Sequence, residues 1–514
     1  MALLTQHLLD SDNMTWICKT IFVAILTYWI TWVFYARTIH PLAKIPGPFL
    51  ATISGVWTMY HAYAGDLEIQ HRALHQRYGL LIRVAPDEIV CSDPKEIPRI
   101  YPFTNPLQKT PWYDAWRPNL PGRRDMFMNR DEKDHAAYRR TIGHVYSLSS
   151  VLKNEAKLEE TVLLFIERLD EFAQTHVSFD FGIWLEMFAY DNIGVIFFGK
   201  QFGFLKDSVD YKGYIRAVHN AMPFLNLLAA SPRYVRPLLM GIAIAIPALL
   251  KSVMAVGDVA KTAQRETKHA QARSEADTAK RFDMTSQMLG IVRDKGEKDI
   301  FGVNEIVSEI WIAVLAGADS TSIAIRTIFY YLMKNPSKLT KLRNEIDAAF
   351  DGGAVTSPVQ HNQAVKLPYL VAVIRESFRI FSPHQISQPR ISPRQGLVLA
   401  GKFIPGGYYV GCNAAVLHHH KDTFGEDTST FRPERWIENT EEQIKLMQKS
   451  MLHFGAGTHS CIGQHIAMAE TYKVVPEIIR RFDFKLTHDG EWKTQNAGFN
   501  VQSGVTCYSE KRQS

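Results

Sequence analysis

The stretch Phe454–Gly463 reads FGAGTHSCIG and places Cys461 where a glycine-rich loop runs into a helical pattern over residues 462–475. Gly455 and Gly457 permit left-handed turns before the cysteine. Free backbone N–H groups and the dipole at a helix N-terminus favour a thiolate over a thiol. A thiolate with one open face can serve as an axial haem ligand. The alternatives are a buried inert cysteine and a catalytic nucleophile, although no nearby Cys–His arrangement supports the nucleophile.

The composition is that of a globular chain with a modestly basic balance. The 514 residues are 46% hydrophobic and 21% charged, with a net charge of +6. These values exclude a disordered, collagen-like or disulfide-scaffold chain. No basic patch is concentrated anywhere, so nucleic acid is not an expected partner. The five cysteines are widely spaced and form no CxxC, which favours a reducing compartment over a disulfide framework or a zinc site.

An apolar run near the N-terminus predicts a membrane anchor. Trp16–Tyr35 is long enough to cross the hydrocarbon core and carries one charge, Lys19. A cleaved signal peptide is the alternative, but the chain start is acidic and no small-residue cleavage site follows the run. Arg37 and Lys44 lie after the run, so the positive-inside rule predicts that the rest of the chain is cytosolic.

The remaining patterns predict a mainly α fold with small β-sheets. Gly79–Pro94 holds two strand-like runs around a turn, and strand signals return at Leu397–Val410. His135–Ile346 is mostly helical in its hydrophobic periodicity. Three prolines and a glycine in PLAKIPGP, residues 41–48, predict a stiff non-helical connector. The predicted boundaries are residues 1–37 for a luminal tail and transmembrane anchor, 38–48 for a proline-rich hinge, and 49–514 for one large domain.

A long apolar helix is predicted over Val303–Leu332, and small and hydroxylated residues occupy its middle, Ala316–Ser322 (AGADSTS). Glycine in a helix interior is about 1 kcal/mol less favourable than alanine, so Gly317 needs a reason. One interpretation is a seam where another helix packs closely. The other is a local groove that admits O2 and water beside an iron.

Two charged motifs precede the cysteine loop. Glu376 and Arg379 have an i,i+3 spacing that places both on one helix face, and Arg435 lies within the run Phe431–Trp436. Each motif alone is compatible with an exposed ion pair of little energetic consequence.

Taken together, these motifs resemble those of the cytochrome P-450 family. The ten residues from Phe454 match the family's haem-binding signature at every fixed position, and His459 stands where the family usually has arginine. In their order and spacing, Glu376, Arg379 and Arg435 are similar to the family's Glu-Arg-Arg structural triad, which would lock the loop behind the haem.

The resemblance also implies residues for catalysis and for binding the haem propionates. The family's oxygen-activation motif is similar to residues 316–321 and assigns Asp319, Ser320 and Thr321 as catalytic, with serine in place of threonine directly after the acid. The family's C-helix pattern Trp-x-x-x-Arg is similar to residues 135–139, with histidine in place of tryptophan. The implied propionate contacts are His135, Arg139, Arg390 and His459.

Membership of this family implies a triangular, mainly helical haem-thiolate domain and a microsomal monooxygenase most similar to fungal secondary-metabolism members. Its cofactor is haem b with Cys461 as the axial iron ligand, its co-substrate is O2, and NADPH acts only through a separate reductase. NADPH–cytochrome P-450 reductase is the expected partner, with cytochrome b5 as a second donor and Lys133 and Arg140 as docking contributors. The expected location is the endoplasmic reticulum membrane.

Two other functions remain open at this point: a haem-thiolate isomerase, dehydratase or peroxide-using enzyme, and a non-enzymatic haem sensor. The acid–hydroxyl pair Asp319–Ser320 favours the monooxygenase. The resemblance implies a pocket for a sizeable lipophilic substrate such as a terpenoid, alkaloid or polyketide. The expected walls are Phe103–Asp125, Ala221–Leu250, Ala313–Thr321, Pro383–Gln388 and Gly498–Asn500.

Overall fold

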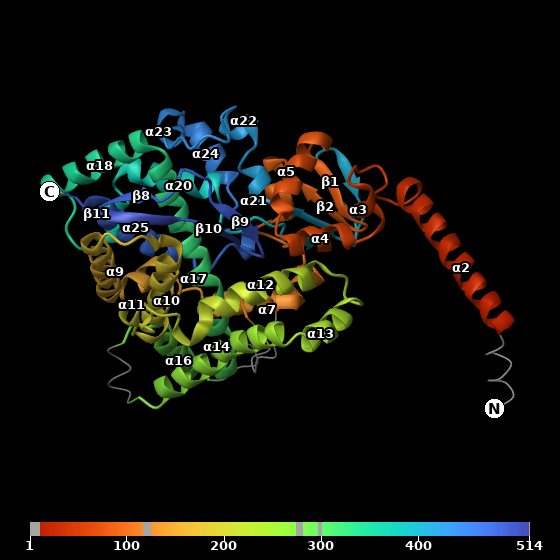
Figure 1. Cartoon of the computed structure of the whole chain (residues 1–514), viewed down its shortest axis with the longest axis horizontal. Helices are drawn as coiled ribbons and strands as arrows, with labels where there is room; N and C mark the ends of the chain where they lie inside the picture. Colours follow the sequence, from red (N-terminus) through yellow and green to blue (C-terminus); the bar gives the residue numbers. More distant parts are fainter. Residues whose placement is uncertain (1–10, 117–124, 274–280, 297–300, 513–514) are drawn as a thin grey trace.

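Helix α17 (Val303–Lys334) runs through the middle of the molecule and organises the packing around it (Figure 1). The structure is a computed structural model that describes residues 11–116, 125–273, 281–296 and 301–512. Helices α10 (Phe181–Phe198), α14 (Pro247–Gln271), α20 (Pro368–Ile380) and α25 (Gln464–Arg481) all contact α17. Because neighbours surround it, α17 carries apolar side chains on more than one face.

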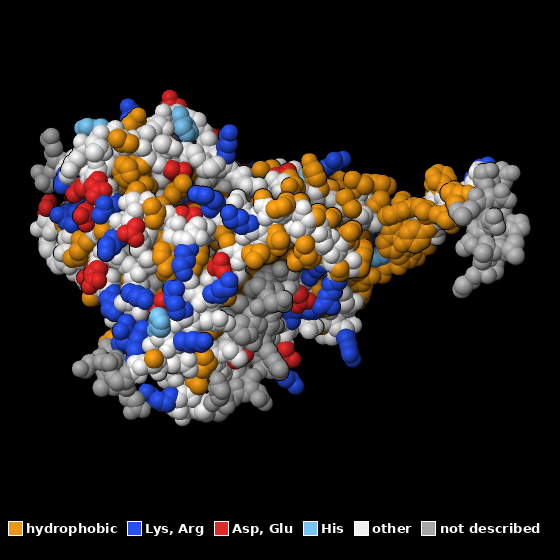
Figure 2. All heavy atoms as spheres, turned by 60° about the horizontal axis from the view of Figure 1, so that its bottom comes forward, with side chains coloured by type: hydrophobic (Ala, Val, Ile, Leu, Met, Phe, Trp, Pro, Cys, Tyr) orange, Lys and Arg blue, Asp and Glu red, His pale blue; other side chains and the backbone are white. Residues whose placement is uncertain are grey.

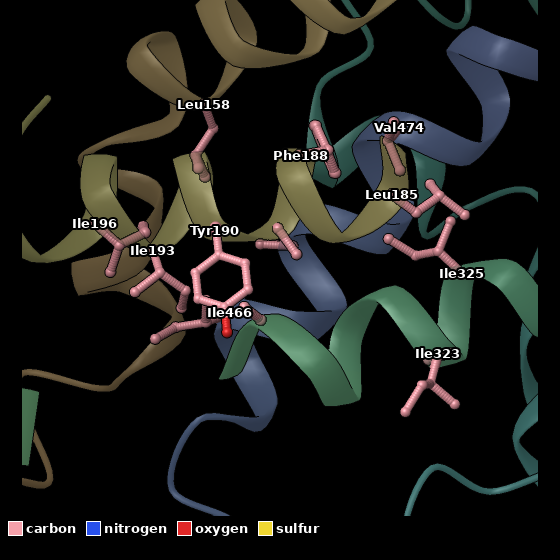
Figure 3. Packing of buried hydrophobic residues seen from close by; sticks show 14 of the residues in the cluster. Leu158, Leu185, Phe188, Tyr190, Ile193, Ile196, Ile323, Ile325, Ile466 and Val474 are labelled. Carbon is pink, nitrogen blue, oxygen red and sulfur yellow. The ribbon is translucent and has the colours of Figure 1, made fainter. Parts of the chain in front are cut away.

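Helix α10 packs alongside α17 and is apolar almost all round, which is typical of a helix at the centre of a large core. Figure 3 shows Leu185 of α10 and Ile325 of α17 pointing toward each other. The hydroxyl of Tyr190 points from α10 to α17 in the same view. Both helices are long and apolar enough to cross a membrane, but 89% of the apolar window of α10 and 67% of that of α17 is buried. They are therefore core helices.

The other helices cover this core on several sides (Figure 1). The longer ones are α4 (Val56–Ala64), α5 (Leu67–Tyr78), α7 (Glu132–Ile142), α9 (Glu155–Thr175), α12 (Tyr214–Ala230), α13 (Arg236–Ala245), α16 (Met284–Lys295), α18 (Pro336–Asp351) and α24 (Glu441–Lys449). The short ones are α3 (Phe49–Ile53), α6 (Ile97–Ile100), α8 (Leu148–Leu152), α11 (Phe204–Asp207), α19 (His361–Ala364), α21 (Ala414–Leu417), α22 (Lys421–Phe424) and α23 (Arg435–Glu438), with 3-10 turns at η1 (Pro94–Glu96), η2 (Pro111–Trp116), η3 (Tyr211–Gly213) and η4 (Gly457–His459).

Four small sheets accompany the helices. The largest has the strand order β1-β2-β7-β4, in which β2 and β7 are parallel and the other pairs are antiparallel. The strands of the four sheets are β1 (Leu81–Ala85), β2 (Glu88–Cys91), β3 (Phe179–Asp180), β4 (Arg390–Ile391), β5 (Leu397–Leu399), β6 (Lys402–Ile404), β7 (Tyr409–Cys412), β8 (Phe482–Leu486), β9 (Lys493–Asn496), β10 (Asn500–Ser503) and β11 (Thr506–Lys511).

Helix α2 (Ser11–Thr38) projects from the domain and exposes its apolar side chains (Figure 1). Its span Met14–Thr38 is apolar enough to cross a membrane, and none of that window is buried. Figure 2 shows hydrophobic side chains continuing from α2 onto the adjoining part of the domain. This surface includes Phe49, Leu50 and Tyr60, each more than half exposed.

The proline-rich segment after α2 is non-helical, and it packs into the domain. Leu42 and Ile45 are buried in the apolar cluster of the large sheet. Gly47 lies so close to β1 that a Cβ there would clash with the carbonyl of Arg83, so only glycine fits. The guanidinium of Arg83 donates to the carbonyl of Ala36 at 2.9 Å. The segment is therefore packed against the domain, while the boundaries at 37 and 48 stay predictions.

The structure confirms the predicted mainly helical fold with small sheets and an apolar N-terminal helix. The strands around the turn at Pro86–Asp87 are present as β1 and β2. The predicted luminal tail lies mostly in residues 1–10, outside the described residues.

Candidate haem-thiolate site

The cysteine loop has the geometry that its glycines predict. Gly455 and Gly457 adopt φ values of +69° and +65°, which L side chains rarely adopt. A Cβ at Gly457 would lie 2.3 Å from the carbonyl oxygen of Tyr101. The backbone N–H of Cys461 donates to the carbonyl of Phe454 at 2.7 Å, which closes the loop just before α25 begins at Gln464.

The thiol of Cys461 faces a cavity inside the protein. Burial raises the pKa of this thiol, and the backbone N–H groups of Gly463 and Gln464 and the charge of Arg139 oppose that rise only in part. The donors at the helix N-terminus thus lower the pKa as the sequence predicts, but in the protein alone desolvation outweighs them. A coordinated metal cation is the partner that deprotonates such a thiol outright.

The cavity has a volume of about 320 Å³ and lies between the cysteine loop and α17. Residues from each of the five predicted wall segments line the cavity. In the segment Ala221–Leu250, however, no residue after Leu225 does, so α13 is not part of the wall. Residues 117–124 of the first segment lie outside the described residues. Ile193 and Phe197 of α10, which the sequence did not single out, also line the cavity. The predicted wall residues that line it include Trp112, Trp116, Met222, Leu225, Ala313, Ala316, Gly317, Ser320, Thr321, Pro383, His384, Gln388, Gly498 and Phe499.

The structure supports both interpretations of the small residues in the middle of α17, the packing seam and the groove beside the cavity. A Cβ at Gly317 would lie 2.8 Å from Cδ1 of Ile193, so the close approach of α10 accounts for this glycine. Ser320 and Thr321 both line the cavity. The Ser320 hydroxyl donates to the Ala316 carbonyl at 2.7 Å, an i−4 bond that fixes its rotamer. The segment is thus a packing seam on one side and a cavity wall on the other.

Asp319 lies behind this wall, buried and in contact with a polar cluster that crosses from α10 to α12. Tyr190 lies with its hydroxyl 3.4 Å from Oδ1 of Asp319. Burial raises the pKa of Asp319 to about 7, and the nearby imidazole of His219 opposes the rise. Burial lowers the pKa of His219, but Glu186, 3.4 Å away, outweighs this and raises it to about 9. Glu186 also accepts from Arg326 at 2.8 Å.

The four predicted propionate contacts converge on the cavity. The rings of His135 and His459 lie 4.4 Å apart between centroids. Burial, and then the charge of Lys109, lower the pKa of each to about 2, so both imidazoles are neutral. Arg139 donates to the carbonyl of Ser460 at 2.8 Å, which ties α7 to the cysteine loop. Nε2 of His459 also lies 3.0 Å from the Glu132 carboxylate, although without the alignment of a hydrogen bond.

Arg390 is the most deeply buried arginine at this site, at 2% exposure. It donates to the hydroxyl of Tyr113 at 2.5 Å and to the carbonyl of Gln388 at 3.0 Å. Among the described residues no carboxylate lies within ion-pair distance of it. The side chain therefore carries a buried positive charge beside the cavity.

The predicted triad is assembled and sealed away from the cavity. Arg379 and Arg435 donate to Glu376 at 2.8 and 3.0 Å, and all three side chains have no exposed surface. Trp436 and the backbone N–H of Arg432 also donate to the same carboxylate. Both oxygens of this buried carboxylate therefore have hydrogen-bond donors, as buried polar groups require.

These residues fit a haem. A haem needs cations for the two carboxylates at its edge, a ligand for its iron on one face and apolar walls around its ring. The cavity is lined by arginines, a cysteine and mostly apolar side chains, so it supplies all three. Cys461 would hold the iron, and Arg139 and Arg390 would meet the carboxylates.

Comparison with known proteins identifies the family. The family model described as Cytochrome P450 matches residues 46–507. A cytochrome P450 monooxygenase of Alternaria alternata, ACRTS1, is 49% identical over 73% of this chain and 99% of its own length. A second, gsfF of Penicillium aethiopicum, is 39% identical over 94% of this chain and 96% of its own. Pisatin demethylase of Fusarium vanettenii is 31% identical over 92% and 90%.

The chain belongs to the cytochrome P-450 family. It is a haem-thiolate oxidoreductase that uses O2, takes electrons from a redox partner and acts on a lipophilic substrate. Its apolar N-terminal helix fits anchoring in a membrane.

Sequence reasoning missed two buried charged groups of the cavity wall. Glu309 of α17 accepts from Tyr146 at 2.9 Å and Tyr138 at 3.2 Å, and burial raises its pKa to about 7. The other group is Lys109, in a loop with no recognisable motif. The sequence offers one sign of Glu309, a charged residue on the apolar face of a long predicted helix. It offers no such sign of Lys109.

Proposed function

We propose that this enzyme inserts one oxygen atom from O2 into a lipophilic secondary metabolite, with a terpenoid, alkaloid or polyketide skeleton. The observation that carries the proposal is the position of Cys461 and Ser320 in the walls of one apolar cavity. The bound haem supplies O2 activation, and the thiolate strengthens its oxidising power. The protein supplies the binding surface, the orientation and the protons.

Asp319 and Ser320 are the proposed proton donors. The carboxyl of Asp319 lies between the cavity wall and the Tyr190–His219 cluster, and with a pKa of about 7 it can both hold and release a proton at neutral pH. The hydroxyl of Ser320 lies in the wall itself and would pass that proton into the cavity. Thr321 also lines the cavity and is proposed as a secondary contact.

The aromatic and aliphatic walls support a hydrophobic substrate. Trp112, Trp116 and Phe127 form one continuous aromatic surface, with ring centroids 5.3 and 6.3 Å from that of Trp112. Such walls exclude water and bind planar or polycyclic skeletons by burying their apolar surface. Where on the substrate oxygen is inserted depends on how these rings hold it.

We further propose attachment to the endoplasmic reticulum with the domain on the cytosolic side. The basic residues Arg37 and Lys44 after α2 support this orientation. Exposed apolar residues of α13, such as Leu238 and Ile244, offer a second membrane contact. NADPH–cytochrome P-450 reductase, with cytochrome b5 as a second donor, would dock at the face of the cysteine loop.

The proposal is tested by incubating the membrane-bound enzyme with reductase, NADPH and a library of fungal metabolites. Substrate-stimulated NADPH consumption with a product 16 mass units heavier is expected. Conversion without reductase would favour the isomerase or peroxide-using alternatives. Haem binding with no conversion under any condition would favour a sensor.

A further inference from the structure

One histidine of the cavity wall, His384, has a hydrogen-bond partner for only one of its two ring nitrogens. Nδ1 lies 3.0 Å from the carbonyl oxygen of Gly498. Because a carbonyl oxygen only accepts hydrogen bonds, Nδ1 carries the proton of this contact. Nε2, on the other side of the ring, is buried and has no hydrogen-bond partner among the described residues.

The imidazole is neutral, so Nε2 is an acceptor. Burial lowers the pKa of His384 to about 4, and the contact with the Gly498 carbonyl opposes this fall only in part. In a neutral ring whose proton is on Nδ1, Nε2 offers a lone pair and no hydrogen. Buried polar side-chain atoms nearly always have a partner, since leaving one without a partner is costly. The partner that Nε2 lacks is a hydrogen-bond donor.

The backbone on both sides of His384 is tied to the segment that holds Gly498. The backbone N–H of Asn500 donates to the carbonyl of Pro383 at 2.8 Å. The side-chain amide of Asn500 donates to Oε1 of Gln385 at 2.9 Å. These bonds fix the position of the imidazole, and a polar group that is fixed before a ligand arrives binds it at a lower cost in entropy.

A second polar atom without a partner belongs to the same wall. A Cβ at Gly498 would lie 2.9 Å from Cη2 of Trp116, so the indole packs directly against this glycine. The indole N–H of Trp116 is buried and has no acceptor among the described residues. The wall therefore presents one acceptor, on His384, and one donor, on Trp116. A hydroxyl group can serve both kinds of atom, whereas an ether or carbonyl oxygen can serve only the donor.

We infer that Nε2 of His384 accepts a hydrogen bond from a hydroxyl group of the substrate, so that the enzyme selects alcohols or phenols over the corresponding ethers. The inference rests on the proposed function, since it takes this cavity to be the place where the lipophilic substrate binds. It makes His384 a specificity-determining residue, because an analogue without the hydroxyl leaves the buried acceptor unpaired.

The test compares a phenol with its methyl ether as ligands of the purified holoenzyme. The probes are estrone and estrone methyl ether, which share one apolar skeleton, and binding is read from the blue shift of the Soret band on titration. The native enzyme should bind estrone roughly 10-fold more tightly, the effect of one hydrogen bond to a buried acceptor. Estrone that binds no more tightly than its ether, or not at all, would overturn the inference.

Substitution of the histidine assigns the preference to Nε2. His384→Phe keeps a ring in the wall and removes both nitrogens, so the two probes should bind within about 2-fold of each other. His269→Phe is the control, at a histidine of α14 that is 60% exposed, and should keep the native preference. If His384 only supported the wall through Gly498, His384→Phe would weaken both probes equally, and this unchanged ratio would overturn the inference.

A conservative variant covers the case in which His384→Phe folds too poorly to purify. His384→Gln keeps an acceptor oxygen near the position of Nε2 and should retain the preference for estrone, and its loss would count against the inference. Binding is measured without reductase or turnover. A failure of the proposed oxygen insertion would therefore leave these results unchanged, and the two failures can be told apart.

Discussion

The molecule buries two groups of charges, one sealed away from the cavity and one in its wall, and they are built in opposite ways. The triad of Glu376, Arg379 and Arg435 has no exposed surface, and its carboxylate receives donors from four residues. The two buried cations of the cavity wall, Lys109 and Arg390, have neutral acceptors and, among the described residues, no ion-pair partner. A saturated cluster fixes structure, whereas an unsaturated one marks a place for a ligand.

The largest effect is expected from breaking the saturated cluster. Glu376→Gln leaves two buried guanidinium groups without their counter-charge, which costs about 3–5 kcal/mol, a large fraction of the stability of a typical domain. The variant should accumulate little haem-containing protein, measured by haem absorbance per milligram and by thermal unfolding.

An exposed pair provides the control for that substitution. Glu441 is 83% exposed and lies 3.2 Å from Lys445, so Glu441→Gln should change stability by no more than about 0.5 kcal/mol. Equal melting temperatures for the two variants would mean that the triad is not a stabilising device.

Substitution of a hydroxyl in the cavity wall should change the yield of product and leave the stability of the protein unchanged. Ser320→Ala removes a hydroxyl from the wall while haem binding and NADPH consumption continue. Product formed per NADPH should fall roughly 10-fold, and hydrogen peroxide should rise. Thr321→Ala, one residue on and about 100° around the helix, should have the smaller effect. The reverse order would show that Thr321 is the hydroxyl that matters.

The smallest effect on the haem site is expected from removing the anchor. A chain that starts at Thr38 loses the hydrogen bonds of Trp32 to Ile53 and of Arg83 to Ala36, together worth about 1–3 kcal/mol. It should still incorporate haem and should be released from membranes more readily by carbonate. Detergent-soluble protein that never takes up haem would place the domain boundary before residue 38.

The sequence predicted what depends on local geometry. The turns at Gly455 and Gly457 and the i,i+3 pair Glu376–Arg379 follow from neighbouring residues alone, and the structure has both. The burial of Lys109 beside Arg390 could not be found in this way, because a backbone bridge joins residues that are 281 positions apart in the chain. The direction of the Cys461 pKa was also beyond reach, because it depends on how deeply the fold buries the thiol.

The cross-helix partners of Asp319 were missed for a related reason. Tyr190 and His219 lie on two other helices, and in the sequence they are an ordinary core tyrosine and an ordinary surface histidine. Only the packing of α10 against α17 brings the hydroxyl of Tyr190 to the carboxyl of Asp319 (Figure 3).

The central claim is that Cys461 binds the haem iron as a thiolate, and the ferrous carbon monoxide spectrum tests it most directly. The native enzyme should show the strongly red-shifted Soret band that thiolate ligation produces. Cys461→Ser replaces the sulfur with a hydroxyl that ionises far less readily and should lose that band, even where some haem stays bound between α17 and the cysteine loop. A Cys461→Ser variant that kept the red-shifted band would contradict the account.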